Sequence, residues 1–209
     1  MKKLVCGFLS VGLLLSSFNV SIAKADEVTS LKGSPEVGDV IVTVGADLTE
    51  KQRFELLNKF NVVESDTNIV KVTIDDEKEY LGSYVSKERM GNKSYSNSKI
   101  EILKEGSGID VSTSNISWVS EAMYANALLT AGVQDAKIEV TAPFEVSGTG
   151  ALTGIIKAYD SYEDVELNKE QIDIANEEMV TSAEISDEIG VEEADALLDN
   201  PVNFNEAMK

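Results

Sequence analysis

The chain has 209 residues, with 18 lysines and arginines against 37 aspartates and glutamates, and a net charge of −19 at pH 7. It contains no histidine and a single cysteine, Cys6. Nucleic acid is disfavoured as a partner, because phosphate backbones are bound by clustered basic side chains. The residue content also argues against disulfides, thiol or imidazole chemistry, and the usual zinc, copper and haem sites.

The N-terminus has the pattern of a secretory signal peptide. Lys2 and Lys3 precede a mostly apolar stretch over 4–20, and Ala23 and Ala25 offer the small residues of a cleavage site. A retained membrane anchor is the less favoured alternative, because a helix needs about 20 apolar residues to cross a bilayer. We therefore predict cleavage after Ala25 and a secreted or extracytoplasmic location in the cell envelope.

The region after residue 39 begins with a strand and an amphipathic helix. A β-branched run at 40–44 predicts the strand. Thr49 and Gln52 then match a capping box, in which the two side chains satisfy amide groups at the start of a helix. Apolar residues at helical spacing predict the buried face of this helix: Phe54, Leu57 and Phe60.

A second strand and helix, followed by a β-hairpin, are predicted next. The apolar run 69–74 predicts the strand, and the acidic run 75–77 predicts the start of the helix, since acids are favourable at a helix N-terminus. Segments 96–104 and 108–114 have the composition of strands and are separated by a short turn that contains glycine. We therefore predict that these two segments pair directly.

Two helices, at 118–131 and 151–162, and a strand at 136–141 complete the predicted elements of the domain. The strands and helices alternate irregularly, which favours the α+β class, with a mixed β-sheet covered by helices mainly on one face. We place this α+β domain at residues 39–162, after a polar, flexible lead-in at 26–38.

Acidic residues dominate the C-terminal part, 163–209. Asn168 is the predicted N-cap of a long helix, and Gly190 separates that helix from a shorter one that Pro201 closes. We predict an acidic helical appendage here, either docked on the sheet or partly mobile.

The strongest hint of a binding site is the glycine-rich segment 146–154, between a predicted strand and a predicted helix. Its candidate ligand-binding residues are Ser147, Gly148, Thr149 and Gly150, whose backbone amides would approach an anion at the helix N-terminus. The glycine spacing matches neither the dinucleotide fingerprint nor the phosphate-binding loop of nucleotide hydrolases. A plain strand-to-helix turn, with glycines for close packing, is the interpretation we favour.

Catalytic residues, metal ligands and cofactors are not predicted. Ser96 and Lys99 have the spacing of penicillin-recognising enzymes, but in a strand they point to opposite faces. The sequence has no acidic calcium-binding loop. Trp118, the single tryptophan, is interpreted as a core or hinge residue rather than a platform for sugars.

Without a catalytic constellation, the sequence favours a non-enzymatic binding or interaction protein whose partner is an unknown protein or a cell-wall component. The alternative is a carboxylate-dependent hydrolase that acts on cell-wall glycan, because two acids are all that such chemistry requires.

Several motifs resemble a family of secreted proteins of Gram-positive Firmicutes that is catalogued only as a domain of unknown function. The resemblance covers most of residues 35–165 and implies a bacterial source and export, without assigning a reaction or the role of any residue. Family members usually continue further in a helical C-terminal part. The motifs are GSGIDV at 106–111, ISWV at 116–119, MYANAL at 123–128, TAGVQDAK at 130–137, APF at 142–144, VSGT at 146–149, ALTGI at 151–155 and KAY at 157–159.

Overall fold

The structure, a computed structural model, describes residues 30–198. The predicted signal peptide, the start of the lead-in and the end of the appendage with Pro201 lie outside the described residues. In chain order the elements are β1 (Val40–Gly45), α1 (Glu50–Lys59), a 3-10 turn (Glu64–Asp66), β2 (Asn68–Val72), α2 (Ile74–Leu81), α3 (Lys87–Met90), β3 (Asn97–Ile102), β4 (Ile109–Ile116), α4 (Glu121–Thr130), β5 (Ala136–Val146), α5 (Thr149–Asp160), α6 (Lys169–Ile189) and α7 (Val191–Leu198).

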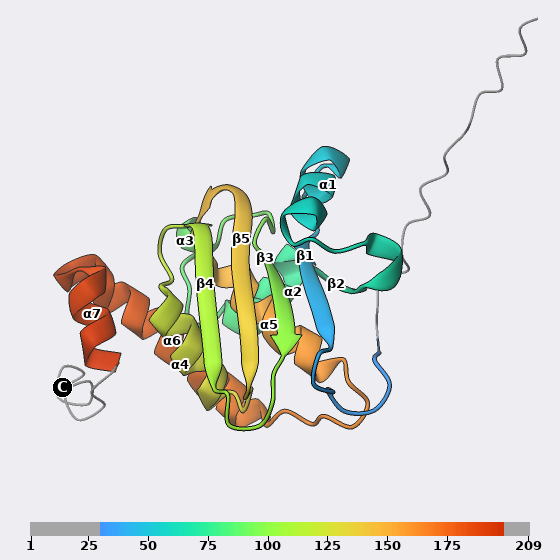
Figure 1. Cartoon of the computed structure of the whole chain (residues 1–209). Coiled ribbons are helices and arrows are strands. Elements are labelled where there is room, and N and C mark those ends of the chain that lie inside the picture. The colour runs from blue at the N-terminus through green and yellow to red at the C-terminus, as the bar shows by residue number, and fades with distance from the viewer. Residues whose placement is uncertain (1–29, 199–209) are drawn as a thin grey trace, which may run out of the picture.

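The strands form a mixed five-stranded sheet in the order β2-β1-β3-β5-β4. β1 and β2 run parallel, as do β4 and β5, whereas β3 is antiparallel to both of its neighbours. Figure 1 shows α2, α4, α5 and α6 behind the sheet, and α1 near the end formed by β1 and β2. This arrangement confirms the α+β class, with a mixed sheet covered by helices and with a C-terminal helical part.

A row of apolar side chains crosses the helix-covered face of the sheet. Ile41 pairs with Ile100, which pairs with Ile138, which in turn pairs with Val111. All of these residues belong to one core, to which α4 and α5 contribute buried aliphatic side chains. Because successive strand residues point to opposite faces, the positions between them form the other face of the sheet.

That other face is partly apolar and partly charged. α1 covers β1 and β2 with Leu56, Leu57 and Phe60, which form a second, smaller core. Further across the sheet, Lys99 and Glu139 are cross-strand neighbours and form an ion pair of 3.3 Å. The helices therefore lie mainly on one face, as the sequence predicts.

The predicted hairpin of β3 and β4 was wrong, because β5 lies between these two strands. β4, α4 and β5 form a strand–helix–strand unit in which the helix returns the chain to a parallel position beside β4. β5 then pairs along its other edge with β3. The turn between β3 and β4 thus spans the width of one strand instead of closing a hairpin.

The capping box of α1 is confirmed, but its predicted buried face is wrong at one position. Gln52 N donates to Thr49 Oγ1 (3.3 Å), and Thr49 N donates to Gln52 Oε1 (2.9 Å). Phe54 is 65% exposed, and Leu56 is buried in its place. The apolar spacing therefore located the helix and two residues of its buried face, Leu57 and Phe60, correctly.

The predicted helices at 118–131 and 151–162 are present with shifted first residues. α4 is capped by Ser120, whose Oγ accepts a hydrogen bond from Met123 N (3.1 Å). α5 follows directly on Gly148, which adopts the left-handed conformation. Each helix therefore starts where a capping residue allows it, which apolar spacing does not reveal.

The described part of the acidic C-terminal region packs onto the helical layer. α6 begins at Asn168, whose Oδ1 accepts hydrogen bonds from Glu170 N (2.9 Å) and Gln171 N (3.2 Å), and it ends before Gly190. It contacts α4 and α2, and its buried residues share the core of the sheet. Among residues 30–198, none of the helices has the length and hydropathy needed to span a membrane.

Candidate functional site

An open pocket of about 250 Å³ lies beside the N-terminus of α5. Its wall comes from three segments: α2, the stretch from α3 to the start of β3, and the turn between β5 and α5. We call it the Glu77 pocket, after the acidic residue of α2 that lines it. The lining residues are Glu77, Arg89, Met90, Gly91, Asn92, Lys93, Tyr95, Ser96, Val146, Ser147 and Thr149.

The structure divides the four predicted ligand-binding residues into two groups. Ser147 and Thr149 line the Glu77 pocket, and their hydroxyl oxygens lie 3.3 Å apart. Gly148 and Gly150 do not line it, and they serve close packing. A β-carbon at Gly150 would overlap the carboxyl group of Glu77. Glycine at that position therefore admits Glu77 to the N-terminus of α5, and binding by these residues stays a prediction.

Gly148 combines a special backbone conformation with a tight contact. Its φ is +100°, and a β-carbon there would overlap Tyr124 Oη and Ile116 Cγ2. Tyr124 Oη donates a hydrogen bond of 2.6 Å to the carbonyl oxygen of Gly148. Burial and the nearby Glu77 raise the pKa of Tyr124 far above its ordinary value, so its hydroxyl stays a donor. The turn that forms one pocket wall is thus fixed from the core side.

Glu77 is a buried carboxyl group, since only 2% of the residue is exposed. Its Oε2 accepts a hydrogen bond from Thr149 Oγ1 (3.2 Å). Burial raises the pKa of this carboxyl, the hydroxyls of Ser94 and Thr149 partly oppose that effect, and the charges of Asp47 and Asp76 add to it. Ser94 lies near enough to affect Glu77, although its Oγ makes no hydrogen bond of regular geometry. No basic group contributes to the pKa shift of Glu77.

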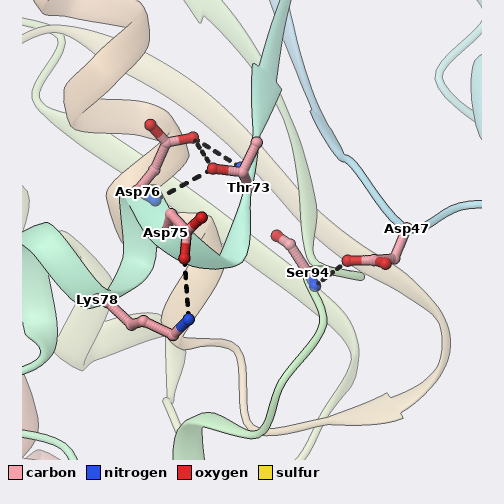
Figure 2. A network of polar contacts seen from close by, with 6 residues as sticks. All are labelled: Asp47, Thr73, Asp75, Asp76, Lys78 and Ser94. Atoms are coloured by element: carbon pink, nitrogen blue, oxygen red, sulfur yellow. Dashed lines mark hydrogen bonds and ion pairs between the residues drawn. The ribbon is translucent and has the colours of Figure 1, made fainter.

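The two aspartates near Glu77 have partners of their own, most of which Figure 2 shows. Asp76 Oδ2 accepts hydrogen bonds from the backbone and side chain of Thr73, both at 2.7 Å, and it forms an ion pair of 2.9 Å with Lys157. Burial alone would raise the pKa of Asp76, but Lys157 and Thr73 outweigh it and lower that pKa. Asp47 Oδ2 accepts from the backbone amide of Ser94 at 2.9 Å. Both carboxylates therefore accept hydrogen bonds from groups other than Glu77.

The aromatic wall of the pocket is formed by Tyr95, which contacts Phe144 edge to face at 4.8 Å between ring centroids. Lys93 Nζ lies 5.9 Å from the centre of the Tyr95 ring, within the range of a cation–π contact. Ser96 is 5% exposed, and its hydroxyl makes no hydrogen bond with another residue of the described chain. The pocket therefore combines an aromatic surface, a cation and hydroxyl groups.

A cluster of three side chains ties α3 to α6. Arg89 Nη2 forms an ion pair of 2.5 Å with Asp187 Oδ2, and the Arg89 guanidinium lies 4.6 Å from the Trp118 ring centre. Trp118 Nε1 donates to the same oxygen of Asp187 at 3.1 Å. Trp118 is 5% exposed, which confirms its interpretation as a core residue. Arg89 thus has both an anionic and an aromatic partner.

A second pocket, of about 290 Å³, lies between the end of β4 and α7 and contains two acids. Glu121 Oε1 accepts a hydrogen bond from Thr113 N (2.8 Å), and Asp195 Oδ1 accepts one from Ser120 Oγ (2.6 Å). Both carboxyl groups therefore help to hold the local structure. Within residues 30–198, no group of three or more acids is arranged to hold a metal ion.

Sequence reasoning missed Glu77, although the chain carries a signal for it. The acidic run 75–77 was interpreted only as the start of a helix. Ile74, Glu77 and Leu81 are three and four residues apart, so they share one face of α2. Leu81 is fully buried and Ile74 packs against the core, which places Glu77 on the buried face.

The comparisons place this chain in a defined family. The chain belongs to the family described as "Protein of unknown function (DUF1002)", whose model matches residues 44–203. It is 47% identical over 199 residues to "Uncharacterized protein YpuA" of Bacillus subtilis (strain 168). That match covers 95% of this chain and 65% of the relative, so the chain spans less than two thirds of the relative's length. No solved structure matched the chain. The predicted resemblance to a Firmicute family of unknown function is confirmed.

Proposed function

We propose that this protein is an exported, non-enzymatic binding protein of the cell envelope, and that the Glu77 pocket holds a small polar ligand. One observation carries the binding part: a buried carboxyl group lines an open pocket of about 250 Å³, and no cation is among the groups that shift its pKa. An ionisable group in a concave site is a reason to suspect function. Export is supported by the N-terminal pattern around Ala23 and Ala25.

Binding is favoured over catalysis by the groups that the pocket contains. A serine or threonine nucleophile needs an adjacent base, and the chain has no histidine to supply one. Thr149 Oγ1 donates a hydrogen bond to Glu77 Oε2, a geometry that also suits a fixed structural role. Glu77 is the single acid among the lining residues, so the pocket lacks the carboxyl pair of a glycosidase.

Thermal unfolding of the purified chain with candidate ligands tests the binding proposal. A ligand present at 100 times its Kd stabilises the folded state by about 2.7 kcal/mol, which raises Tm measurably. Candidates are free amino acids, neutral sugars and inorganic phosphate. We expect at least one to raise Tm in the wild type and to lose that effect in Thr149→Val. Ser112→Ala, on the open face of β4, is the matched control and should keep it.

The proposal fails if saturating amounts of every candidate leave Tm unchanged. Export is tested separately, by N-terminal sequencing of protein recovered from a Gram-positive host. We expect the protein outside the cytoplasm, with a new N-terminus at Asp26. Protein that stays in the cytosol with Met1 intact would refute the export part and leave the pocket argument standing.

The alternative, a hydrolase of cell-wall glycan, has its best location in the pocket beside α7. This pocket brings Glu121 and Asp195 together with Trp118 along one wall. Release of reducing ends from purified cell wall, abolished by either Glu121→Gln or Asp195→Asn, would establish that alternative. We favour binding, because both acids already accept hydrogen bonds from their own chain.

A further inference from the structure

We propose that the ligand of the Glu77 pocket is a small zwitterion, with its ammonium group against Glu77 and its carboxylate against Lys93. Free α-amino acids and short peptides belong to this chemical class. The inference rests on the proposed function, since it names the ligand of the same pocket. It is carried by three features of the wall: a buried acid, a serine that lines the pocket and whose hydroxyl has no partner within residues 30–198, and a lysine without a carboxylate partner there.

The acid end of the pocket is suited to an ammonium group. Glu77 is 2% exposed, and its carboxyl group accepts a hydrogen bond from a neutral hydroxyl, that of Thr149. Buried acids are ordinarily paired with a cation or held neutral. The carboxylates of Asp47 and Asp76 add negative potential around Glu77, which disfavours its own charge and favours a bound cation. A ligand ammonium would supply the missing positive charge.

An ammonium group has three hydrogens to donate, and the wall offers acceptors besides Glu77. Ser96 is 5% exposed and lines the pocket, and within the described chain its hydroxyl has no hydrogen-bond partner. Ser147 lines the same wall, with its hydroxyl 3.3 Å from that of Thr149. The carboxyl and these hydroxyls together can satisfy a primary ammonium.

The other end of the ligand is set by the basic residues of the wall. Arg89 is engaged by Asp187 and stacks on Trp118, so its charge is already paired. Lys93 contacts the face of Tyr95, and it forms no ion pair with any acid in residues 30–198. Lys93 is therefore the cation open to an incoming carboxylate. A neutral sugar would leave both Glu77 and Lys93 without a charged partner.

Proton linkage separates a zwitterion from a neutral ligand. An ammonium group binds best to ionised Glu77, whose pKa is raised mainly by burial in the free protein. Binding therefore releases a proton while Glu77 is protonated, and the affinity rises with pH until Glu77 is ionised without the ligand. A ligand that accepts a hydrogen bond from the protonated acid would show the opposite dependence.

Isothermal titration of the full chain with each of the twenty standard amino acids, and with their dipeptides with alanine, provides the test. The best binder is then compared with its amide, which lacks the carboxylate, and with its N-acetyl form, which lacks the ammonium. We expect the amide and the N-acetyl form each to bind at least about 10-fold more weakly, a change equivalent to about 1.4 kcal/mol. The affinity of the parent compound should rise as the pH is raised.

Variants assign these effects to the pocket. Glu77→Gln should weaken the best binder at least about 10-fold and remove the pH dependence. Lys93→Met should weaken the parent compound and leave its amide unchanged. Glu139→Gln, on the open face of the sheet, is the matched control and should bind normally. Circular dichroism establishes that each variant is folded, and Lys93→Met gives a second test if Glu77→Gln is not.

The outcomes distinguish this inference from the proposed function. Binding of N-acetylglucosamine or inorganic phosphate, with no binding of amino acids or dipeptides, would overturn the zwitterion and leave a binding pocket. Amino-acid binding that is unaffected by both Glu77→Gln and Lys93→Met would also overturn it. If none of these compounds binds, the inference and the proposed function fail together.

Discussion

Replacing Gly148 with alanine tests whether the turn before α5 is fixed by packing. Gly148 has a φ of +100°, and its added β-carbon would overlap Tyr124 Oη and Ile116 Cγ2. The left-handed conformation costs an L-residue about 1–2 kcal/mol. Displacing Tyr124 would break its hydrogen bond to the Gly148 carbonyl and leave the buried Tyr124 hydroxyl unpaired, for about 1–3 kcal/mol more. We expect a total loss of about 2–5 kcal/mol of unfolding free energy.

Gly38→Ala is the matched control for this variant. Gly38 has a φ of +95°, close to that of Gly148, but no atom lies within 4 Å of its added β-carbon. It should therefore lose only the backbone contribution, about 1–2 kcal/mol. Urea unfolding followed by the fluorescence of Trp118 measures both losses, with far-UV circular dichroism as a second probe. Equal losses in the two variants would refute the argument that Tyr124 and Ile116 require glycine at position 148.

Three further changes have clear expected outcomes. Because burial raises the pKa of Glu77, the stability that its protonated form contributes is present below the ordinary glutamate value of 4.5 and is lost as the pH rises through the raised pKa. In urea unfolding, the stability of Glu77→Gln relative to the wild type should therefore increase as the pH is raised above 4.5, and a difference that does not change with pH would contradict this. Thr49→Ala removes the cap of α1 and should lower the free energy of unfolding by about 1 kcal/mol in the same assay. An unchanged free energy would mean that the capping box does not stabilise the protein. Asp187→Asn removes the negative charge that pairs with Arg89 and weakens the contact of α6 with Arg89 and Trp118. It should shift the emission maximum of Trp118, while an unchanged spectrum would show that the cluster does not form in solution.

The sequence predicts those elements whose signals are local. The capping box at Thr49 and Gln52 and the N-cap at Asn168 are formed by residues close in the chain, and both are confirmed. The α+β class follows from the order of strands and helices, which local patterns also provide. Phe54 shows the limit of this reasoning, because apolar spacing located α1 but placed this exposed residue on its buried face.

Strand pairing could not be read from the turn between β3 and β4. Residues 103–108 join the two strands, and a chain of six residues can extend to about 20 Å. Two strand spacings amount to about 10 Å, so this linker can close a hairpin or pass over an intervening strand. The β4–α4–β5 sequence favours the second arrangement, since a helical crossover places two parallel strands side by side. The helical crossover was therefore the better guide to strand order.

The candidate site was predicted in part. Ser147 and Thr149 were found because a glycine-rich turn before a helix is a visible signal, and both line the Glu77 pocket. Glu77 itself comes from a segment about 70 residues earlier, and its contact with Thr149 depends on the tertiary packing of α2 against α5. Such a contact needs the fold, although the shared face of Ile74, Glu77 and Leu81 would have shown that this acid is buried.

The position of β5 determines when the sheet can be completed during synthesis. β5 is the last strand in chain order, yet it lies inside the sheet between β3 and β4. Until residues 136–146 are available, β4 has no partner strand, and the growing chain exposes one edge of β3 together with both edges of β4. Open edges of this kind favour association with other chains. A nascent chain that ends before Ala136 therefore cannot complete the sheet. A chaperone that covers these edges would act before residues 136–146 are synthesised.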